Sequence, residues 1–158
     1  MDEINAEALA GLSAAIESLL EGVVDSPTQL RLLVTPTRIS PTGLGGFVGL
    51  NEDPQGGILG RRLQATALVS LSARDVESLN EAVAAVTGAF LGTERGTLQQ
   101  KGILRVGLDN IGPGSTTGSG SNRREERPLT FNVLYEFLKK PEESEGTILE
   151  VPINLDAT

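Results

Sequence analysis

The sequence contains no cysteine, no histidine and no tryptophan, and these absences limit the chemistry that it can support. Without cysteine, the chain has no disulfide, no thiolate nucleophile and no thiolate metal ligand. Without histidine, it also lacks the imidazole group of Ser-His-Asp arrangements and of the usual zinc and iron sites. We therefore expect no cofactor, no metal site and no enzymatic activity.

Basic residues are also scarce, with 13 Lys and Arg against 21 Asp and Glu, for a formal net charge of −8. This charge repels phosphate groups, so neither sequence-specific nucleic acid nor a membrane surface is an expected partner. No apolar run approaches the roughly 18 residues of a membrane span. The N-terminal sequence MDEINAEALAGL is acidic where a signal peptide is basic. The expected product is soluble and cytoplasmic.

The length of 158 residues fits one domain. With only four Phe and one Tyr, the core must be built mainly from Leu, Val, Ile and Ala. We expect residues 1–140 to form a single α+β domain and residues 141–158 to form an extended C-terminal arm.

Two segments have the apolar spacing of amphipathic helices. Between residues 4 and 23 apolar side chains recur every three or four positions, and Gly22 stands where a left-handed residue often ends a helix. The same spacing runs over residues 76–90, and Gly92 is expected to end that helix. Residues 72–75, Ser-Ala-Arg-Asp, resemble a capping box in front of it.

Four segments have the composition and alternation of β-strands. The first is short and predicted near an edge, because Pro36 and Pro41 lack the N–H group that sheet pairing needs. The last carries Phe131, Tyr135 and Phe137, which are expected to lie in the core of a central strand. The prediction is a mainly antiparallel sheet of about four strands with two helices packed on it. The four segments are residues 29–34, 62–72, 103–108 and 129–137.

Three further segments are expected to join or extend these elements. Residues 41–60 mix Gly and Pro with apolar side chains, which favours a hairpin or long loop that docks on a partner. Residues 112–122, GPGSTTGSGSN, have the composition of a flexible linker. Residues 147–155 alternate like a strand, but Pro152 limits pairing to one side, as in an arm that pairs with a neighbouring subunit.

The arginines form two local basic spots, at residues 61–62 and 123–127. They are expected to be solvated, to pair with Glu125 and Glu126, or to contact an acidic partner surface. The Gly-rich residues 114–120 lack the Lys and the following helix of a phosphate-binding loop, so a plain loop is the interpretation there.

The order of these elements resembles that of phage tail terminator proteins. Residues 60–75, GRRLQATALVSLSARD, run into the second helix and look like the corresponding strand of that family. Residues 129–137, LTFNVLYEF, are similar to its last sheet strand. The resemblance covers residues 4–140 and departs from the family in the Gly/Pro segment, the Gly/Ser loop and the C-terminal arm.

The resemblance implies a structural virion protein that is assembled in the host cytoplasm. Such a protein forms a homohexameric ring on the end of a tail tube or sheath, stops polymerisation and joins the tail to a neck or connector protein; a related cap closes contractile injection systems. Its candidate interface residues here are Leu44, Phe47, Val48, Leu50, Ile58, Leu59, Arg61, Arg62, Arg123, Arg124, Arg127, Leu149, Val151 and Ile153.

Two other classes of function stay open on the residues alone. One is a small-ligand or carbohydrate-binding β-rich module, in which the Gly-rich segment covers a pocket. The other is an enzyme that works with Asp, Glu, Ser or Lys only. A saturable ligand would indicate the first and turnover the second, whereas a closed ring would indicate the terminator.

Overall fold

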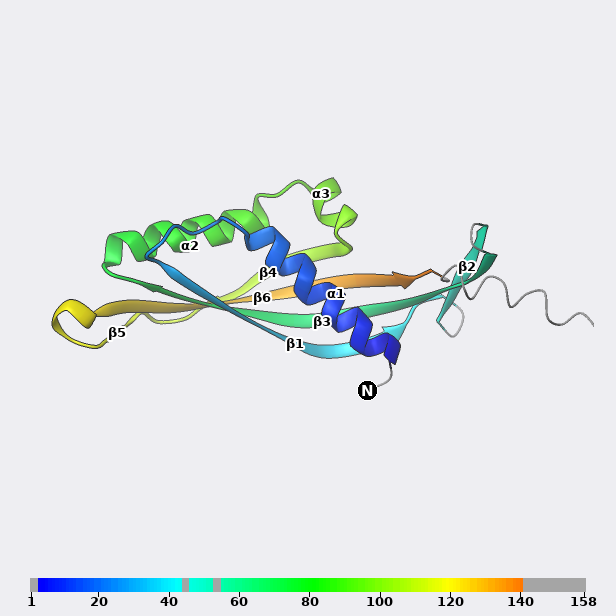
Figure 1. Ribbon diagram of the computed structural model, residues 1–158, viewed down its shortest axis with the longest axis horizontal. Coiled ribbons are helices and arrows are strands. Elements are labelled where there is room, and N and C mark those ends of the chain that lie inside the picture. Colours follow the sequence, from blue (N-terminus) through cyan, green and yellow to red (C-terminus); the bar gives the residue numbers. More distant parts are fainter. Residues whose placement is uncertain (1–2, 44–45, 53–54, 141–158) are drawn as a thin grey trace, which may run out of the picture.

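The structure is a computed structural model that describes residues 3–43, 46–52 and 55–140 (Figure 1). The chain is α+β, with a mostly antiparallel six-stranded sheet and three α-helices in the described residues. Its elements are α1 (Glu3–Leu20), β1 (Gln29–Pro41), β2 (Phe47–Glu52), β3 (Gln55–Ala73), α2 (Val76–Leu91), α3 (Arg95–Gln100), β4 (Ile103–Ile111), β5 (Ser115–Thr117), a 3₁₀ turn η1 (Gly120–Asn122) and β6 (Arg124–Lys139).

The sheet is organised around two long strands, β3 and β6, which lie side by side at its centre. The strand order is β1-β3-β6-β4, and every pair is antiparallel. The register between β3 and β6 runs unbroken from Leu59↔Lys139 to Ala73↔Glu125. The short strand β2 extends one end of β3, and β5 extends the opposite end of the sheet along β6 (Figure 1). The molecule is therefore elongated along these strands.

All three helices lie on one side of the sheet, and no described helix covers the other side, which we call the bare face (Figure 1). The core is a single layer between the sheet and the helices α1 and α2. Within it, the rings of Phe90 from α2 and Phe131 from β6 stack with centroids 4.0 Å apart. The fully buried residues include Leu12, Ile16, Leu63, Leu71, Val69, Val86, Ile103 and Leu129.

The strand count exceeds the expected four because β2 and β5 were not among the four predicted strands; β1 and β3 are also longer than predicted. β1 continues through Pro36 to Pro41, since it is an edge strand and a register shift between Pro36 and Arg38 absorbs the missing N–H group. The hydroxyl of Thr37 at this bulge donates to the carbonyl of Gln64 at 3.0 Å. β3 begins at Gln55, so the predicted hairpin in the Gly/Pro segment exists and is part of the sheet.

The Gly/Ser stretch at residues 112–122 also differs from the flexible linker that its composition predicts. It contains β5, which pairs with the first residues of β6, and the turn η1. The sequence analysis assigned no helix or strand between residues 92 and 103, where the structure has α3 with Leu98 as its only buried side chain. A six-residue helix with one buried apolar position has too little periodicity to be recognised.

Three local details correct the predicted elements. The helix α2 is capped by Asp75, whose carboxylate accepts from the backbone N–H of Ser78; Ser72 belongs to β3, so the capping-box interpretation was wrong. In β4, a register shift after Ile103 turns Ile103 toward the core together with Val106, which alternation alone did not predict. The helix α1 ends at Leu20, before Val23, and Gly22 is left-handed as predicted, with φ 71°.

The described helices include none that is long and apolar enough to cross a membrane. The predicted C-terminal arm, residues 141–158, lies outside the described residues.

Replacing Gly102 with alanine should destabilise the fold more than replacing Gly22. Both glycines have positive φ, 87° and 71°, where an alanine costs roughly 1–2 kcal/mol. A Cβ at Gly102 would lie 2.7 Å from Cε2 of Tyr135 and 2.9 Å from the carbonyl oxygen of Glu136, whereas nothing lies within 4 Å at Gly22. Urea unfolding should show a free-energy loss of about 1–2 kcal/mol for Gly22→Ala and a larger loss for Gly102→Ala. Equal losses would contradict this account.

Replacing Asp75 with asparagine should make the stability of the fold less dependent on pH. Hydrogen bonds from the backbone and side chain of Ser78 lower the pKa of Asp75. Because its pKa is lowered in the folded state, the charged carboxylate stabilises the fold at pH values above its unfolded pKa of ~3.9. This stabilisation is lost as the pH falls through the lower, folded-state pKa. Asparagine keeps the acceptor but removes the charge.

Thermal unfolding over an acid-to-neutral pH series checks this. The parent should melt higher than Asp75→Asn at neutral pH, and the two curves should converge in acid. A difference that stays constant with pH would show that the charge of Asp75 does not contribute.

Candidate interaction surfaces

The β2–β3 hairpin places exposed apolar side chains at one end of the molecule. Phe47, Val48 and Leu50 are 44%, 42% and 76% exposed, and Leu138 at the end of β6 is 44% exposed. Ile58 and Leu59, on the paired segment of β3, are half-buried. The structure thus brings together five of the apolar candidates predicted from the sequence; Leu44 lies outside the described residues, as do Leu149, Val151 and Ile153.

Glycines let the apolar side chains of this hairpin lie directly against its backbone. A Cβ at Gly60 would be 2.6 Å from a methyl group of Val48 and 3.2 Å from a methyl group of Leu138, and one at Gly57 would be 3.2 Å from the ring of Phe47. The Cβ positions at Gly57 and Gly60 lie on opposite faces of β3, because the two residues are three apart in a strand. Apolar groups therefore lie on both faces of the hairpin.

The base of the hairpin is held by Arg61. Its Nε donates to the side-chain oxygen of Asn5 in α1 at 3.0 Å, and its Nη1 donates to the carbonyl of Gly60 at 2.9 Å. The N–H of Gly60 donates to the carbonyl of Gly46 at 2.7 Å. These bonds connect the hairpin to the helix that packs on the sheet, so the exposed apolar side chains are presented by an anchored element.

The other predicted arginines also have partners within the chain. Arg62 forms an ion pair with Glu136 across β3 and β6 at 2.9 Å. At the opposite end, Arg123 pairs with Glu125 at 3.0 Å and Arg127 donates to the carbonyl of Gly112 at 2.8 Å. The predicted pairing of Arg123 with Glu125 is confirmed. Their possible contacts with a partner stay a prediction.

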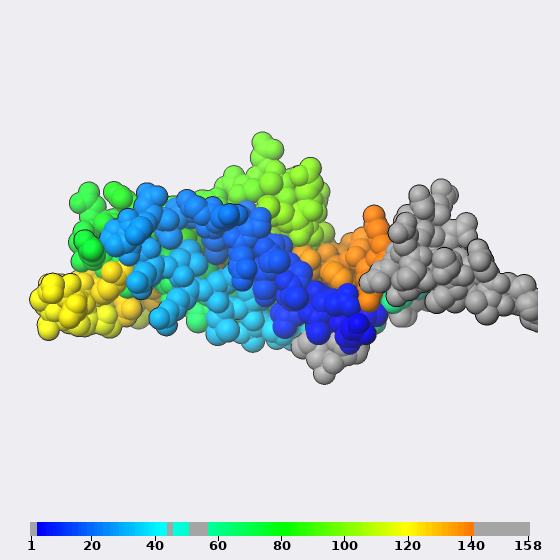
Figure 2. All heavy atoms as spheres, in the orientation of Figure 1, coloured from blue at the N-terminus to red at the C-terminus, as the bar shows by residue number. Residues whose placement is uncertain are grey.

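Arg124 joins three segments of the chain. Its Nε donates to the hydroxyl of Ser72 at 2.7 Å, and its Nη2 donates to the carbonyls of Ser72 at 2.7 Å and Pro27 at 3.1 Å. These atoms belong to β6, to the end of β3 and to the turn before β1. Beyond β5, which pairs with Arg124–Glu126, the chain turns through residues 118–123 at one tip of the molecule, coloured yellow in Figure 2.

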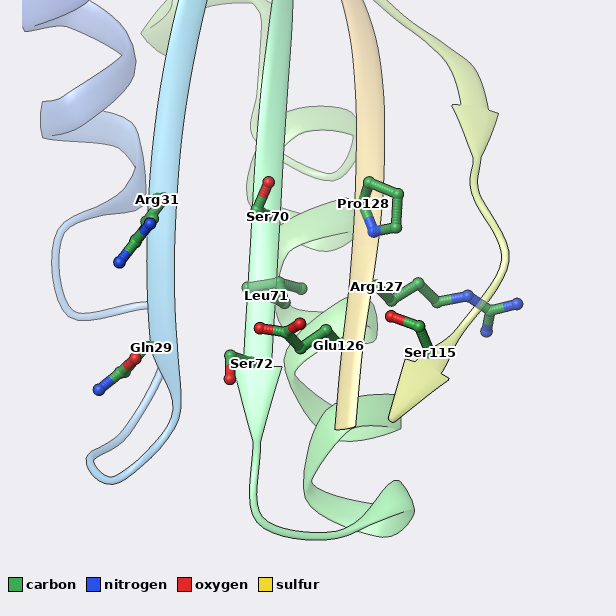
Figure 3. Close-up of a pocket in the computed structure, with 9 residues that line it drawn as sticks. All are labelled: Gln29, Arg31, Ser70, Leu71, Ser72, Ser115, Glu126, Arg127 and Pro128. Carbon is green, nitrogen blue, oxygen red and sulfur yellow. The ribbon is translucent and has the colours of Figure 1, made fainter. Parts of the chain in front are cut away.

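The bare face of the sheet is a second unpartnered surface. It carries two shallow hollows of about 390 Å³ each. Figure 3 shows the first of them, with Arg31, Ser70 and Glu126 in front of the strands and a helix behind. The second is lined by polar residues, among them Gln64, Arg105 and Asn132, and about equally by apolar ones such as Val133 and Leu134. Their open form and mixed polar and apolar lining suit surface contact better than an enclosed ligand.

Sequence reasoning missed the isolated arginines of this face, Arg31, Arg38 and Arg105. Each is a single basic residue within a strand, so none appears as a cluster along the chain. The only available signal was the alternation of the strands, which places Arg31 between Leu30 and Leu32, and Arg105 between Leu104 and Val106.

No catalytic constellation appears among these groups. The described residues contain no group of three or more Asp and Glu that could hold a metal ion. Burial raises the pKa of Tyr135, whose ring lies in the core beside α1, so the phenol stays neutral near pH ~7. No family model matches the chain, and a search of curated proteins finds no match.

Replacing Arg124 with alanine should destabilise the fold, whereas replacing Arg62 should have little effect. Arg124 makes three charge-assisted hydrogen bonds. Without the guanidinium group their acceptors would lose their partner, which should lower the free energy of unfolding by about 1–3 kcal/mol. Arg62 forms one ion pair and its side chain is 46% exposed, which corresponds to less than about 1 kcal/mol. Lysine at position 124 should not restore stability, because one ammonium group cannot reach all three acceptors.

Urea unfolding of Arg124→Ala, Arg124→Lys and Arg62→Ala measures these differences. Equal losses for Arg62→Ala and Arg124→Ala would contradict the prediction that the junction between β6, β3 and the turn before β1 contributes more to stability than the exposed Arg62–Glu136 pair.

Proposed function

We propose that this chain is a structural assembly protein of a phage tail or of a contractile injection system. Copies of it form a ring, hexameric in the family that the sequence resembles, which sits on the end of a tail tube or sheath. The ring stops polymerisation and provides the surface on which a neck or connector protein binds. The proposal makes no use of a cofactor, and the site of action is the virion tail.

The observation that carries this proposal is the anchored apolar hairpin at one end of an elongated sheet. A solvent-exposed cluster of Phe47, Val48, Leu50 and Leu138 is costly to leave in water, and such clusters commonly mark protein contacts. The hairpin is fixed to α1 through Arg61 and Asn5, so binding does not require the cluster to be ordered first. A ring subunit needs such a rigid contact with the tube.

Two further features support an assembly role. The molecule presents two distinct surfaces, the hairpin and the bare face, and a ring subunit on a tube must contact both its neighbours and the tube. In addition, the outer edges of β1 and β4 have no partner strand among the described residues. These edges could accept extended segments from neighbouring chains by strand addition.

The mass of the purified protein tests the proposal most directly. It should be measured for the full chain, for a chain lacking residues 141–158, and for each mixed with the candidate tube protein. A ring in solution, or a monomer that becomes a ring on the tube, is the expected result, and the shortened chain shows whether the C-terminal segment closes it. A monomer that ignores the tube, and that binds a small ligand saturably, would replace this proposal with the binding-module alternative.

Polar substitutions in the hairpin should abolish binding to the tube without unfolding the protein. In the variant Phe47→Ser, Val48→Ser and Leu50→Ser, the apolar cluster is lost, but the substituted side chains are all exposed and the core is untouched. Co-sedimentation with tubes should fall at least about tenfold, since burying a single large apolar side chain contributes about 1.5–3 kcal/mol.

The matched control for this experiment is Leu108→Ser, which changes a 38% exposed apolar residue in β4, away from the hairpin. It should bind tubes as the parent does, and circular dichroism should show the same fold in all three proteins. Equal loss in the control and in the hairpin variant would exclude the hairpin as the docking element.

A further inference from the structure

The two faces of the molecule carry opposite charge. The helix layer, which we define as α1 and α2, contains Glu3, Glu7, Glu17, Glu77 and Glu81 and has no Lys or Arg within its bounds. All of these except Glu7 are exposed, and Glu7 pairs with Lys139 at 3.0 Å. The exposed charges that α1 and α2 themselves carry are therefore acidic. Lys101 also reaches this layer, where its ammonium group donates to the hydroxyl of Ser18 in α1 at 2.9 Å.

The bare face carries three exposed arginines whose side chains make no hydrogen bond or ion pair with the residues that the structure describes: Arg31, Arg38 and Arg105. Their position on one face follows from the register. Arg31 of β1 lies opposite Ser70 of β3. Arg38 of β1 lies opposite Gln64, which is six residues before Ser70 in β3. Gln64 in turn pairs with Leu134, which pairs with Arg105. Directly opposed residues of a sheet share a face, so the three guanidinium groups project together.

The acidic groups of the bare face do not cancel this charge. Glu136 is occupied by its ion pair with Arg62. Glu126 lies opposite Ser72 near the end of the sheet, on the side of Arg31. Arg38 and Arg105 lie in one row that crosses the four strands from β1 to β4. Three spacings of ~4.8 Å separate these strands, so the backbone positions of the two arginines are about 14 Å apart. The row contains no acidic residue, since its other members are Gln64 and Leu134.

We propose that the bare face of one copy packs against the helix layer of the next copy. The arginines of the bare face would then meet the exposed glutamates of the neighbouring copy. The charges would be complementary at every contact between copies. The contact joins two different surfaces, so it is heterologous, and repeating it generates either a closed ring or a filament. The inference deepens the proposed ring and rests on it, because it names the surfaces that adjacent ring subunits share.

The apolar and small side chains of the two surfaces suit a close contact. On the bare face, Leu33 is 59% exposed, and on the helix layer Val76 and Leu91 are 56% and 47% exposed. Between Glu81 and the end of α2, the exposed positions are Ala84 and Gly88, whose small size allows another surface to approach closely, and Leu91. Pairing the two surfaces would cover apolar area as well as charge.

Charge reversal on each surface, followed by mixing, tests this contact. The sheet variant carries Arg31→Glu, Arg38→Glu and Arg105→Glu in the full-length chain. Its self-association, measured by sedimentation velocity in low salt, should weaken at least about tenfold relative to the parent, because like charges then face each other. Association of the parent itself should weaken as salt is raised.

The helix variant carries Glu17→Lys, Glu77→Lys and Glu81→Lys and should be equally defective alone. Mixing the two variants should restore association, since alternating them gives opposite charges at every junction of a ring with an even number of subunits. Restoration on mixing is the decisive result, because a merely unfolded or over-charged variant cannot be rescued by another defective one.

The control has three reversals outside the bare face, Arg74→Glu, Arg95→Glu and Lys140→Glu. It shares the formal net charge of the sheet variant, −8 − 6 = −14, and should associate as the parent does. The inference is overturned if the sheet variant associates like the parent, if mixing restores nothing, or if the parent stays monomeric at its highest soluble concentration in low salt.

Failure of the proposed function has a different signature. If the parent does not bind tubes but the charge-reversed variants rescue each other, the contact between copies is correct and the tail assignment is wrong. If the sheet variant loses only its binding to tubes, the bare face contacts the tube and the second-copy assignment is wrong.

Discussion

The structure depends on the unbroken antiparallel pairing of β3 with β6. These strands run side by side from Leu59 to Ala73, and their inward side chains form most of the sheet's contribution to the core. Both helices pack on this pair, with Phe90 of α2 stacked on Phe131 of β6. Because side chains alternate between faces, the same register that buries one set presents the other on the bare face. A one-residue slip would exchange the two sets and destroy the core and the surface together.

Irregularities in the sheet occur where the flanking strands have to bend or end. β1 has a bulge next to Pro36, and β4 shifts register after Ile103 and again after Leu108. The central strands have no such shifts in their mutual pairing. Bulges increase local twist, and at the edges they also make regular pairing with stray strands less favourable. The regular centre thus keeps the chain folded, whereas the irregular edges limit pairing with stray strands.

The sequence predicted the α+β class, both long helices and the central position of β6, because these elements have many buried positions at regular spacing. It underestimated β1 and β3 because proline and glycine lower strand propensity, and neighbouring strands compensated for that locally. It located the hairpin's apolar residues but not the anchoring bond from Arg61 to Asn5, which joins positions 56 residues apart. It also could not collect Arg31, Arg38 and Arg105 onto one face, since that requires the register of four strands.

The hairpin and the β5 turn lie at opposite ends of the same two strands (Figure 1). A force that pulls these ends apart therefore acts along the strands, and the backbone hydrogen bonds between β3 and β6 lie across that direction. Such a force shears all of these bonds at once and cannot open them one after another. The fold should therefore resist tension applied between its two ends, while the helices, which lie on one side of the sheet, remain outside the line of force.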